Sequence, residues 1–314
     1  MSEIKKIIVL SICILILIIS TTYKYKATKA DTKIVNKDIK ASLNLISKPE
    51  NTSFTIYQLP PVGSSQIMSY AISTDNSLFI IDGGTGSESK YLEDFINSHG
   101  NKVDAWFITH PHPDHVGALT DILNGGRIII DKLYHSLPKR EWIKAYEPEY
   151  IRTYDNLESA INNSKVTQQR LELYQKIIIN NISITILLVN NPEITRNAIN
   201  NSSLIFKIAS KDRNVLFLGD AGLEEGKKLI NTVPESILKS EFVQMAHHGQ
   251  NGVGEEVYKE IAPEYCLWPT PKWLWDNDAG KGYNSGKWKT IQVRSWMKDV
   301  KKDYTSFQAI TVIN

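Results

Sequence analysis

Short apolar runs and segments with helical spacing follow one another along most of the chain. Runs with the length and composition of β-strands lie at 54–59, 67–73, 78–82, 103–110, 127–134, 182–189, 204–209, 215–220, 242–246, 265–268 and 307–313. Segments with helical spacing lie at 87–99, 116–123, 223–238, 254–261 and 289–300. The first strands follow one another directly and the later ones alternate with helices, which predicts sheets covered by helices in an α/β layered domain.

Two segments depart from this alternation. Residues 136–176 are polar and aromatic with mostly helical spacing, so we interpret them as an insertion or a lid. Residues 269–288 form an aromatic loop after a strand. Five of the seven tryptophans lie in or beside this loop, at Trp268, Trp273, Trp275, Trp288 and Trp296. Exposed indole rings suit a choline headgroup, a sugar ring or a base, whereas buried ones are packing residues, and the pattern leaves both open.

The N-terminus has the pattern of an export signal. Lys5 and Lys6 precede a predominantly apolar run from Ile7 to Ile19, which is typical of a secretory signal peptide. The run is shorter than the roughly 20 residues that cross a membrane comfortably. We therefore predict a signal peptide or an uncleaved membrane anchor over 1–30, a linker over 31–50 and the main domain over 51–314. That domain is then secreted, or anchored on the outer side of the cytoplasmic membrane.

Charge and cysteine content narrow the class of protein. The formal net charge is +2, but residues 1–30 carry five Lys against one Glu, so the remainder sums to −2. A mildly acidic body is a poor general binder of nucleic acid, which is expected only as a substrate. Residues 272–302 are an exception, because seven Lys and one Arg outnumber three Asp and favour an anionic substrate. The two cysteines, Cys13 and Cys266, leave any metal to histidines and carboxylates.

The densest cluster of chemically active side chains is the string HPHPDH at residues 110–115. It stands where an apolar strand ends and a helix begins, near Val116. Alternate residues of an extended chain point the same way, so His110 and His112 converge. The turn into the helix carries Asp114 and His115 to a second position. Two sets of imidazole and carboxylate ligands suit two divalent cations such as zinc.

Three further apolar strands also end in a carboxylate or an imidazole. A single such residue after a strand is most often part of a turn, but several together predict a site on one edge of the sheets. The residues that these strands deliver are Asp82, Asp220, His247 and His248. His135, at the end of the strand 127–134, is expected either near the same edge or in a solvated loop.

In the order DGG, HxHxDH, GD and HHG, these motifs resemble the metallo-β-lactamase fold superfamily of metal-dependent hydrolases, over residues 54–313. The segments NSSLIF (201–206), LGD (218–220) and AHHG (246–249) are most similar to the branch of competence-type DNA-uptake proteins and phosphocholine esterases. The resemblance implies a four-layer αββα sandwich with the metals at the edge between its two halves. In this chain an export signal or anchor helix would precede the sandwich.

The resemblance also implies a role for each residue of the site. The implied metal ligands are His110, His112, Asp114, His115, Asp220 and His247. Asp114 also orients the nucleophile, and Asp220 bridges the two metals. His247 is the more favoured of the paired histidines as a ligand, and His248 donates to the leaving group or to a phosphoryl oxygen. The implied cofactor is zinc, as one or two divalent cations, with manganese as an alternative.

One feature departs from the superfamily pattern. Many members supply a third histidine to the first metal shortly before the strand that leads to the bridging aspartate. Residues 195–202 contain no histidine here. An amide oxygen of Asn200 or Asn201, or a water molecule, is the expected substitute, and a single occupied metal site is the alternative.

Together these features favour an exported metal-dependent hydrolase that cleaves a phosphodiester with a metal-bound hydroxide. The expected substrates are an envelope polymer, a phosphocholine ester or extracellular nucleic acid. Hydrolysis of carboxylic ester, lactone or lactam bonds is the first alternative, and a non-catalytic, metal-held binding module is the second. No protein partner is evident, and the membrane is a partner only through an uncleaved N-terminal segment.

Overall fold

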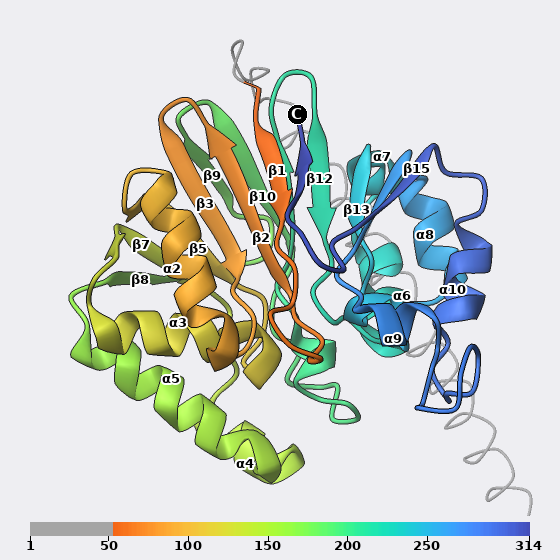
Figure 1. The fold of residues 1–314 in the computed structure, drawn as a ribbon, viewed down its shortest axis with the longest axis horizontal. Coiled ribbons are helices and arrows are strands. Elements are labelled where there is room, and N and C mark those ends of the chain that lie inside the picture. Colours follow the sequence, from red (N-terminus) through yellow and green to blue (C-terminus); the bar gives the residue numbers. More distant parts are fainter. Residues whose placement is uncertain (1–52) are drawn as a thin grey trace, which may run out of the picture. The chain divides into compact units, whose positions relative to one another are not determined.

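Two seven-stranded sheets form the centre of the structure, a computed structural model that describes residues 53–314 (Figure 1). The described residues lie within one unit of the chain, Lys48–Asn314. The predicted signal or anchor over 1–30 and the linker over 31–50 lie outside the described residues. Within residues 53–314, no helix combines the length and the apolar character needed to cross a membrane.

The first sheet has the strand order β16-β1-β2-β3-β5-β7-β8. Its strands are β1 (Thr55–Gln58), β2 (Ser69–Thr74), β3 (Ser77–Asp82), β5 (Ala105–Ile108), β7 (Lys132–His135), β8 (Thr167–Arg170) and β16 (Thr311–Ile313). Strands β16, β1, β2 and β3 pair antiparallel, and β3, β5, β7 and β8 pair parallel. Two short strands, β4 (Lys102–Val103) and β6 (Ile129–Ile130), form a separate parallel pair.

The second sheet has the order β15-β14-β13-β12-β11-β10-β9. Its strands are β9 (Lys176–Ile179), β10 (Ile182–Leu188), β11 (Ile205–Ala209), β12 (Asn214–Phe217), β13 (Phe242–Gln244), β14 (Tyr265–Trp268) and β15 (Lys302–Thr305). As in the first sheet, one half is antiparallel and the other half, β12 to β15, is parallel.

Helices cover the outer faces of both sheets (Figure 1). Beside the first sheet lie α2 (Ser89–Ser98), α3 (Pro113–Gly125), α4 (Arg140–Tyr146) and α5 (Ile151–Asn163). Beside the second lie α6 (Leu223–Thr232), α7 (Glu235–Leu238), α8 (Glu255–Ile261), α9 (Lys272–Trp275) and α10 (Thr290–Trp296). Short 3-10 turns occur at η1 (Gly86–Glu88), η2 (Pro148–Tyr150), η3 (Asn200–Ser202) and η4 (His247–Gly249).

Three apolar clusters hold these layers together. Successive side chains of a strand point to opposite faces, so Trp106 of β5 packs with Leu119 of α3 while its neighbour Phe107 faces the second sheet. Phe107 stacks on Phe206 of β11 with ring centroids 5.0 Å apart. A third cluster joins the outer face of the second sheet to its helices, for example through Leu229 of α6. The result is a mixed α/β fold of helices, sheet, sheet and helices.

The structure corrects two predicted helix boundaries. The helix expected from Val116 begins at Pro113, because a proline at the first helical position has its φ already set for a helix. Asp114 therefore lies in the first turn of α3 rather than in a preceding loop. The single helix expected over 223–238 is two helices, α6 and α7, since Pro234 interrupts the pattern.

Sequence patterning missed three strands, β8, β9 and β15, each of which lies at an edge of its sheet. The polar strands β8 and β15 lack a strong apolar alternation because their side chains are mostly solvent-exposed. Within the predicted segment 136–176, α5 buries Leu157 and Ile161 in the cluster that covers the first sheet. This segment thus contributes both a helix to the outer layer and an edge strand to the sheet.

Candidate metal centre

The first two histidines of the 110–115 string face each other just beyond the end of β5. His110 is fully buried, and its Nε2 lies 3.1 Å from Nδ1 of His112. His112 precedes α3 in an extended conformation, with φ −81° and ψ 153°. The convergence that the alternation of side chains predicts for His110 and His112 is therefore seen in the structure.

The first turn of α3 supplies the next two groups. His115 is fully buried, and its Nε2 lies 3.3 Å from Oδ2 of Asp220. Asp114 points towards the second sheet, where its Oδ2 lies 3.2 Å from Nε2 of His248. The two halves of the fold meet at this point, because Asp220 and His248 follow the parallel strands β12 and β13. The site lies at the carboxyl ends of parallel strands, where many α/β folds bind their ligands.

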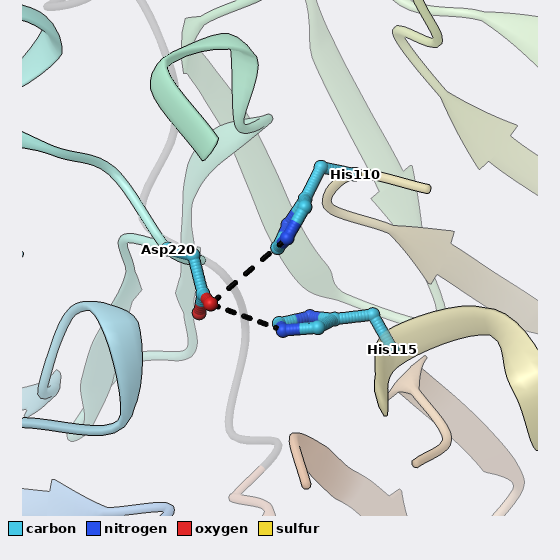
Figure 2. A group of neighbouring side chains, drawn as sticks. All are labelled: His110, His115 and Asp220. Carbon is cyan, nitrogen blue, oxygen red and sulfur yellow. Dashed lines mark ion pairs between the residues drawn. The ribbon is translucent and has the colours of Figure 1, made fainter. Parts of the chain in front are cut away.

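Asp220 is the hub of the cluster. The group formed by His110, His115 and Asp220 is shown in Figure 2, where both imidazoles point towards the carboxylate. Oδ2 of Asp220 lies 4.0 Å from Nε2 of His110, 3.8 Å from Nε2 of His247 and 3.4 Å from Nε2 of His248. One carboxylate oxygen thus faces imidazoles from both halves of the site.

The two adjacent histidines differ in their surroundings. His247 and His248 both have a left-handed backbone, with φ of +51° and +54°. His248 is fully buried, and its Nδ1 lies 2.9 Å from the carbonyl oxygen of Pro269, which leaves Nε2 for the carboxylates. The side chain of His247 is 17% exposed, and its Nδ1 has no hydrogen-bond partner.

A buried carboxylate behind the cluster orients one of its imidazoles. Asp82 ends β3, and it accepts hydrogen bonds from the backbone N–H of Thr109 at 2.8 Å and from the Thr109 hydroxyl at 2.7 Å. Its Oδ2 also lies 2.8 Å from Nδ1 of His115. Asp82 therefore fixes the His115 ring with Nε2 towards the cluster, an arrangement common behind metal-binding histidines. Sequence patterning placed this acid at the correct edge but did not reveal its partner.

Electrostatics in the cluster favour charged imidazoles beside ionised carboxylates. Burial by itself lowers the pKa of His115, but Asp220, Asp82 and Asp114 outweigh it and raise that pKa well above its ordinary value. The same competition, won by Asp220 and Asp114, raises the pKa of His248 to about 10. Divalent cations would replace this positive charge, since ligand imidazoles must be neutral.

The carboxyl groups respond in the opposite direction. Burial raises the pKa of Asp220, yet the nearby His248 and His115 bring it well below its ordinary value. Burial likewise raises the pKa of Asp114, and the same two imidazoles lower it to about 2. Burial and the neighbouring imidazoles lower the pKa of His110 well below its ordinary value. Both carboxylates are therefore ionised and able to bind cations at neutral pH.

The donor set fits one or two divalent cations. Several buried polar atoms of the cluster have no hydrogen-bond partner, an unusual state for a folded protein. They include Nε2 of His115 and of His248, Nδ1 of His247 and Oδ1 of Asp220. Two groups have ligand atoms that all lie within 4.8 Å of one another, namely His110 with His115 and Asp220, and Asp114 with His115 and His248. Such mixed nitrogen and oxygen donors are typical of zinc sites.

Asn200 and Asn201, the two candidates to replace a third histidine, differ in whether their amide oxygen is free to bind a metal. Oδ1 of Asn201 accepts from the backbone N–H groups of Gly222 and Glu225, each at 3.1 Å, so it is already used. Oδ1 of Asn200 is buried without a partner, and Asn200 lines the same pocket as Asp220. Asn200 is therefore the amide that the structure offers in place of a third histidine.

His135 does not join the site. Its Nε2 lies 3.1 Å from Oε1 of Gln168 on the edge strand β8, and its Nδ1 accepts from the backbone N–H of Leu137 at 3.3 Å. Both ring nitrogens are thus used by local structure.

A pocket of about 520 Å³ opens over the cluster. The residues that line it include His112, Asp114, Asp220, His247, Trp273 and Trp288. The two indole rings meet edge to face with centroids 5.0 Å apart, and Trp273 Nε1 donates to the carbonyl oxygen of Ser64 at 2.7 Å. The aromatic loop over 269–288 therefore reaches the candidate metal centre.

The other three tryptophans of this region are packing residues. Trp268 is fully buried beneath the HHG turn, and Trp275 stacks under the guanidinium of Arg294 at 3.9 Å. Trp296 packs against Tyr258 of α8. The aromatic cluster thus divides into two pocket residues and three structural ones.

Comparison with known proteins agrees with this geometry. Residues 62–166 match the family model of the metallo-beta-lactamase superfamily. Over this part the chain is similar to that superfamily. The matched residues include the whole HxHxDH string, and the match supports the prediction of a metal-dependent hydrolase. The finer resemblance, to competence-type proteins and phosphocholine esterases, stays a prediction.

Solved structures share the fold over most of the chain. One is the metallo-beta-lactamase fold protein YhfI from Bacillus subtilis, with 11% identity, a TM-score of 0.51, and coverage of 83% of this chain and 99% of that chain. Another is CmlA, a diiron beta-hydroxylase from Streptomyces venezuelae, with 12% identity, a TM-score of 0.51, and coverage of 88% of this chain and 59% of that chain. Among curated proteins, none matches the sequence. At these identities the likeness is one of fold, so the reaction must be argued from the superfamily match and the site.

Proposed function

We propose that this chain is an exported metal-dependent hydrolase that cleaves a phosphodiester. The observation that carries the proposal is the convergence of imidazole and carboxylate groups from β5, α3, β12 and β13 under an open pocket. Export is proposed from the basic and apolar pattern of residues 1–30 alone.

We divide the donor atoms into two sets around Asp220. His110 and His112 would hold one cation, with Asn200 in place of a third histidine. In the second set we assign His248, and not His247, beside Asp114 and His115. Only His248 has its Nε2 within 3.4 Å of a carboxylate oxygen and its other nitrogen tied to the backbone.

A divalent cation such as zinc would lower the pKa of a bound water molecule towards about 7 and stabilise negative charge on the substrate. The residues of the chain position the reacting groups. Asp114 is ionised and able to orient the attacking group from its side of the pocket. Asp82 keeps the His115 ring in place.

His247 is suited to contact the substrate itself. It lines the pocket, it is partly exposed, and its Nδ1 has no partner. Burial lowers its pKa, so at neutral pH it is an uncharged imidazole that can donate a hydrogen bond to a phosphoryl oxygen or a leaving group. The donor role expected for His248 is thus transferred to its neighbour.

The rim of the pocket favours an anionic substrate. Lys287 and Lys289 are exposed and flank the pocket residue Trp288 in the sequence, and no ion pair involves them among residues 53–314. Ammonium groups near a pocket mouth attract a diester anion from a distance, whereas a neutral ester gains nothing from them. Trp288 and Trp273 offer ring faces to the part of the substrate that does not react.

The test is turnover of a panel of chromogenic substrates by the zinc-loaded protein: a phosphodiester, a phosphocholine ester, a carboxylic ester and a β-lactam. We expect the phosphodiesters to be hydrolysed and the His112→Ala variant to lose activity by at least about 100-fold, because it removes a ligand. Preferred turnover of the carboxylic ester or β-lactam would replace the proposal with its first alternative. Bound zinc without turnover of any substrate would favour a binding module.

The basic rim has its own test. In the Lys287→Gln/Lys289→Gln variant, we expect KM for the phosphodiester to rise about three- to tenfold at low ionic strength and the difference to shrink at high salt, where charges are screened. Hydrolysis of any neutral ester should be unaffected. Lys165→Gln, an exposed lysine after α5, is the control. An equal change of KM in the Lys287→Gln/Lys289→Gln variant and in the Lys165→Gln control would contradict a role for Lys287 and Lys289.

A further inference from the structure

His112 has a contact that neither the motif nor the fold accounts for. Its Nε2 is buried, and no described residue makes a regular hydrogen bond to it. The nearest charged group is Oε2 of Glu147, which lies 3.5 Å away at ion-pair distance. Glu147 follows α4, within the predicted insertion over 136–176. Both side chains are largely buried, at 10% exposed for His112 and 13% for Glu147.

The two nitrogens of the His112 ring point to different partners. Nδ1 points inward to His110, and Nε2 points outward to Glu147. The ring of Tyr150, from the same segment as Glu147, lies against the imidazole with centroids 4.2 Å apart. The segment therefore contacts His112 through both a carboxylate and an aromatic ring.

The second oxygen of Glu147 holds another part of the site. Oε1 accepts a hydrogen bond from the backbone N–H of Ala198. Ala198 is fully buried and lies two residues before Asn200, which lines the pocket and whose amide oxygen has no hydrogen-bond partner. The indole N–H of Trp142 adds a second link, at 2.9 Å to the carbonyl oxygen of Pro192 in the same loop. One carboxylate thus connects His112 to the loop that carries Asn200.

We propose that Glu147 is a positioning residue of the metal centre. Its carboxylate accepts the Nε2 proton of His112, which leaves the Nδ1 lone pair free to bind a metal. Carboxylates behind metal-binding histidines commonly act in this way. The segment 136–176 is then part of the metal centre, and not only a cover over it. This inference rests on the proposed function, since it requires that the cluster binds a metal.

The Glu147→Gln variant is a sharp probe because both carboxylate oxygens act as acceptors. A glutamine has one acceptor and one donor at these two positions. If its oxygen keeps the Ala198 N–H, its NH₂ group faces Nε2 of His112 and favours the tautomer with the proton on Nδ1. That tautomer cannot bind a metal through Nδ1. If the oxygen instead turns to His112, two donors face each other at Ala198.

The experiment measures zinc affinity of the full-length chain by competition with a chelator. We expect Glu147→Gln to weaken zinc binding about 10- to 100-fold, the range typical of such partners. Glu147→Ala should weaken zinc binding less than Glu147→Gln does, because it removes the acceptor without adding a donor. Glu149→Gln makes the same change of charge at an exposed glutamate two residues away and should bind zinc like the natural chain.

A second readout separates positioning from general damage. Nitrogen-15 spectra of the histidine rings in the zinc-free protein should show His112 protonated on Nε2 in the natural chain and shifted towards Nδ1 in Glu147→Gln. If the natural chain binds no zinc, the proposed function itself fails. If the natural chain binds zinc and Glu147→Gln binds it equally well, or weakly with an unchanged His112 tautomer, the role of Glu147 is overturned.

Discussion

His247 and His248 are adjacent in the chain, yet their surroundings differ. His248 is buried against Asp114 and Asp220 with its other nitrogen at the Pro269 carbonyl. His247 lines the pocket. The family resemblance favours His247 as the ligand, whereas our proposal assigns His248. The motif does not show which way each ring turns when two successive residues are left-handed.

We expect His248→Ala to weaken binding of the second zinc ion by at least about 100-fold, since even the loss of a ligand's outer partner costs 10- to 100-fold. The variant also leaves two buried carboxylates without their imidazole. His247→Ala should keep its zinc affinity within about threefold and lose kcat instead. Chelator competition and steady-state kinetics on both variants check this. If His247→Ala instead weakened zinc binding more than His248→Ala, the assignment of His247 as the ligand would be correct.

Other single residues show where inference from sequence stops. The convergence of His110 and His112 was predictable, because alternate residues of an extended chain point the same way. The start of α3 at Pro113, which places Asp114 in its first turn, was not predicted. The bond from Asp82 to His115 was not, since the two residues come from different strands and their contact depends on packing. The choice between Asn200 and Asn201 depends on which amide the backbone of Gly222 already uses.

At the scale of the element, the HHG turn relies on a glycine. Gly249 has φ +72°, and a Cβ placed there would lie 2.4 Å from ring atoms of Trp268. The turn can therefore pack directly against the indole ring of Trp268. Trp268 thus supports the turn that carries His248, although it does not line the pocket.

Gly249→Ala should lower the free energy of unfolding of the zinc-free protein by about 2–4 kcal/mol, from a left-handed alanine and an overpacked contact. Gly126→Ala is the matched control, because Gly126 also has a positive φ, of +62°, but has open space around its Cβ position. In the control, the free energy of unfolding should fall by only about 1 kcal/mol. Urea denaturation measures both variants, and equal losses would show that the Trp268 contact has no energetic role.

The layers of the fold could be predicted from element patterns, but several element boundaries could not. Strands such as β3 and β5 are buried on both faces and read as continuous apolar runs. The edge strands β8 and β15 carry polar residues that resemble those of loops. They become strands through pairing with β7 and β14, which is a tertiary interaction.

At the scale of the whole molecule, the site joins the two halves of the sandwich. β5 and α3 deliver His110, His112, Asp114 and His115 from one half, and β12 and β13 are followed by Asp220 and His248 from the other. A cation bound between them would link the halves as well as serve the reaction. Metal binding and stability should therefore be coupled.

Zinc affinity should rise with pH between about 6 and 8. In the zinc-free protein the pKa of His248 is raised to about 10, and that of His115 lies well above its ordinary value. Below those pKa values both imidazoles hold protons that zinc must displace, so each added pH unit favours binding. Calorimetric titration with zinc in two buffers of different ionisation enthalpy should show proton release at pH 7. An affinity that is constant over this range would contradict the charge state of the cluster.

The central claim is that side chains from separate strand ends bind divalent cations. An anomalous difference map of zinc-loaded crystals, collected at the zinc edge, tests it most directly. We predict one or two peaks within bonding distance of the described cluster, at roughly 2.0–2.2 Å from imidazole nitrogens and carboxylate oxygens. The residues around them should be His110, His112, Asp114, His115, Asp220 and His248. Peaks elsewhere, or no peak at this cluster, would contradict the account.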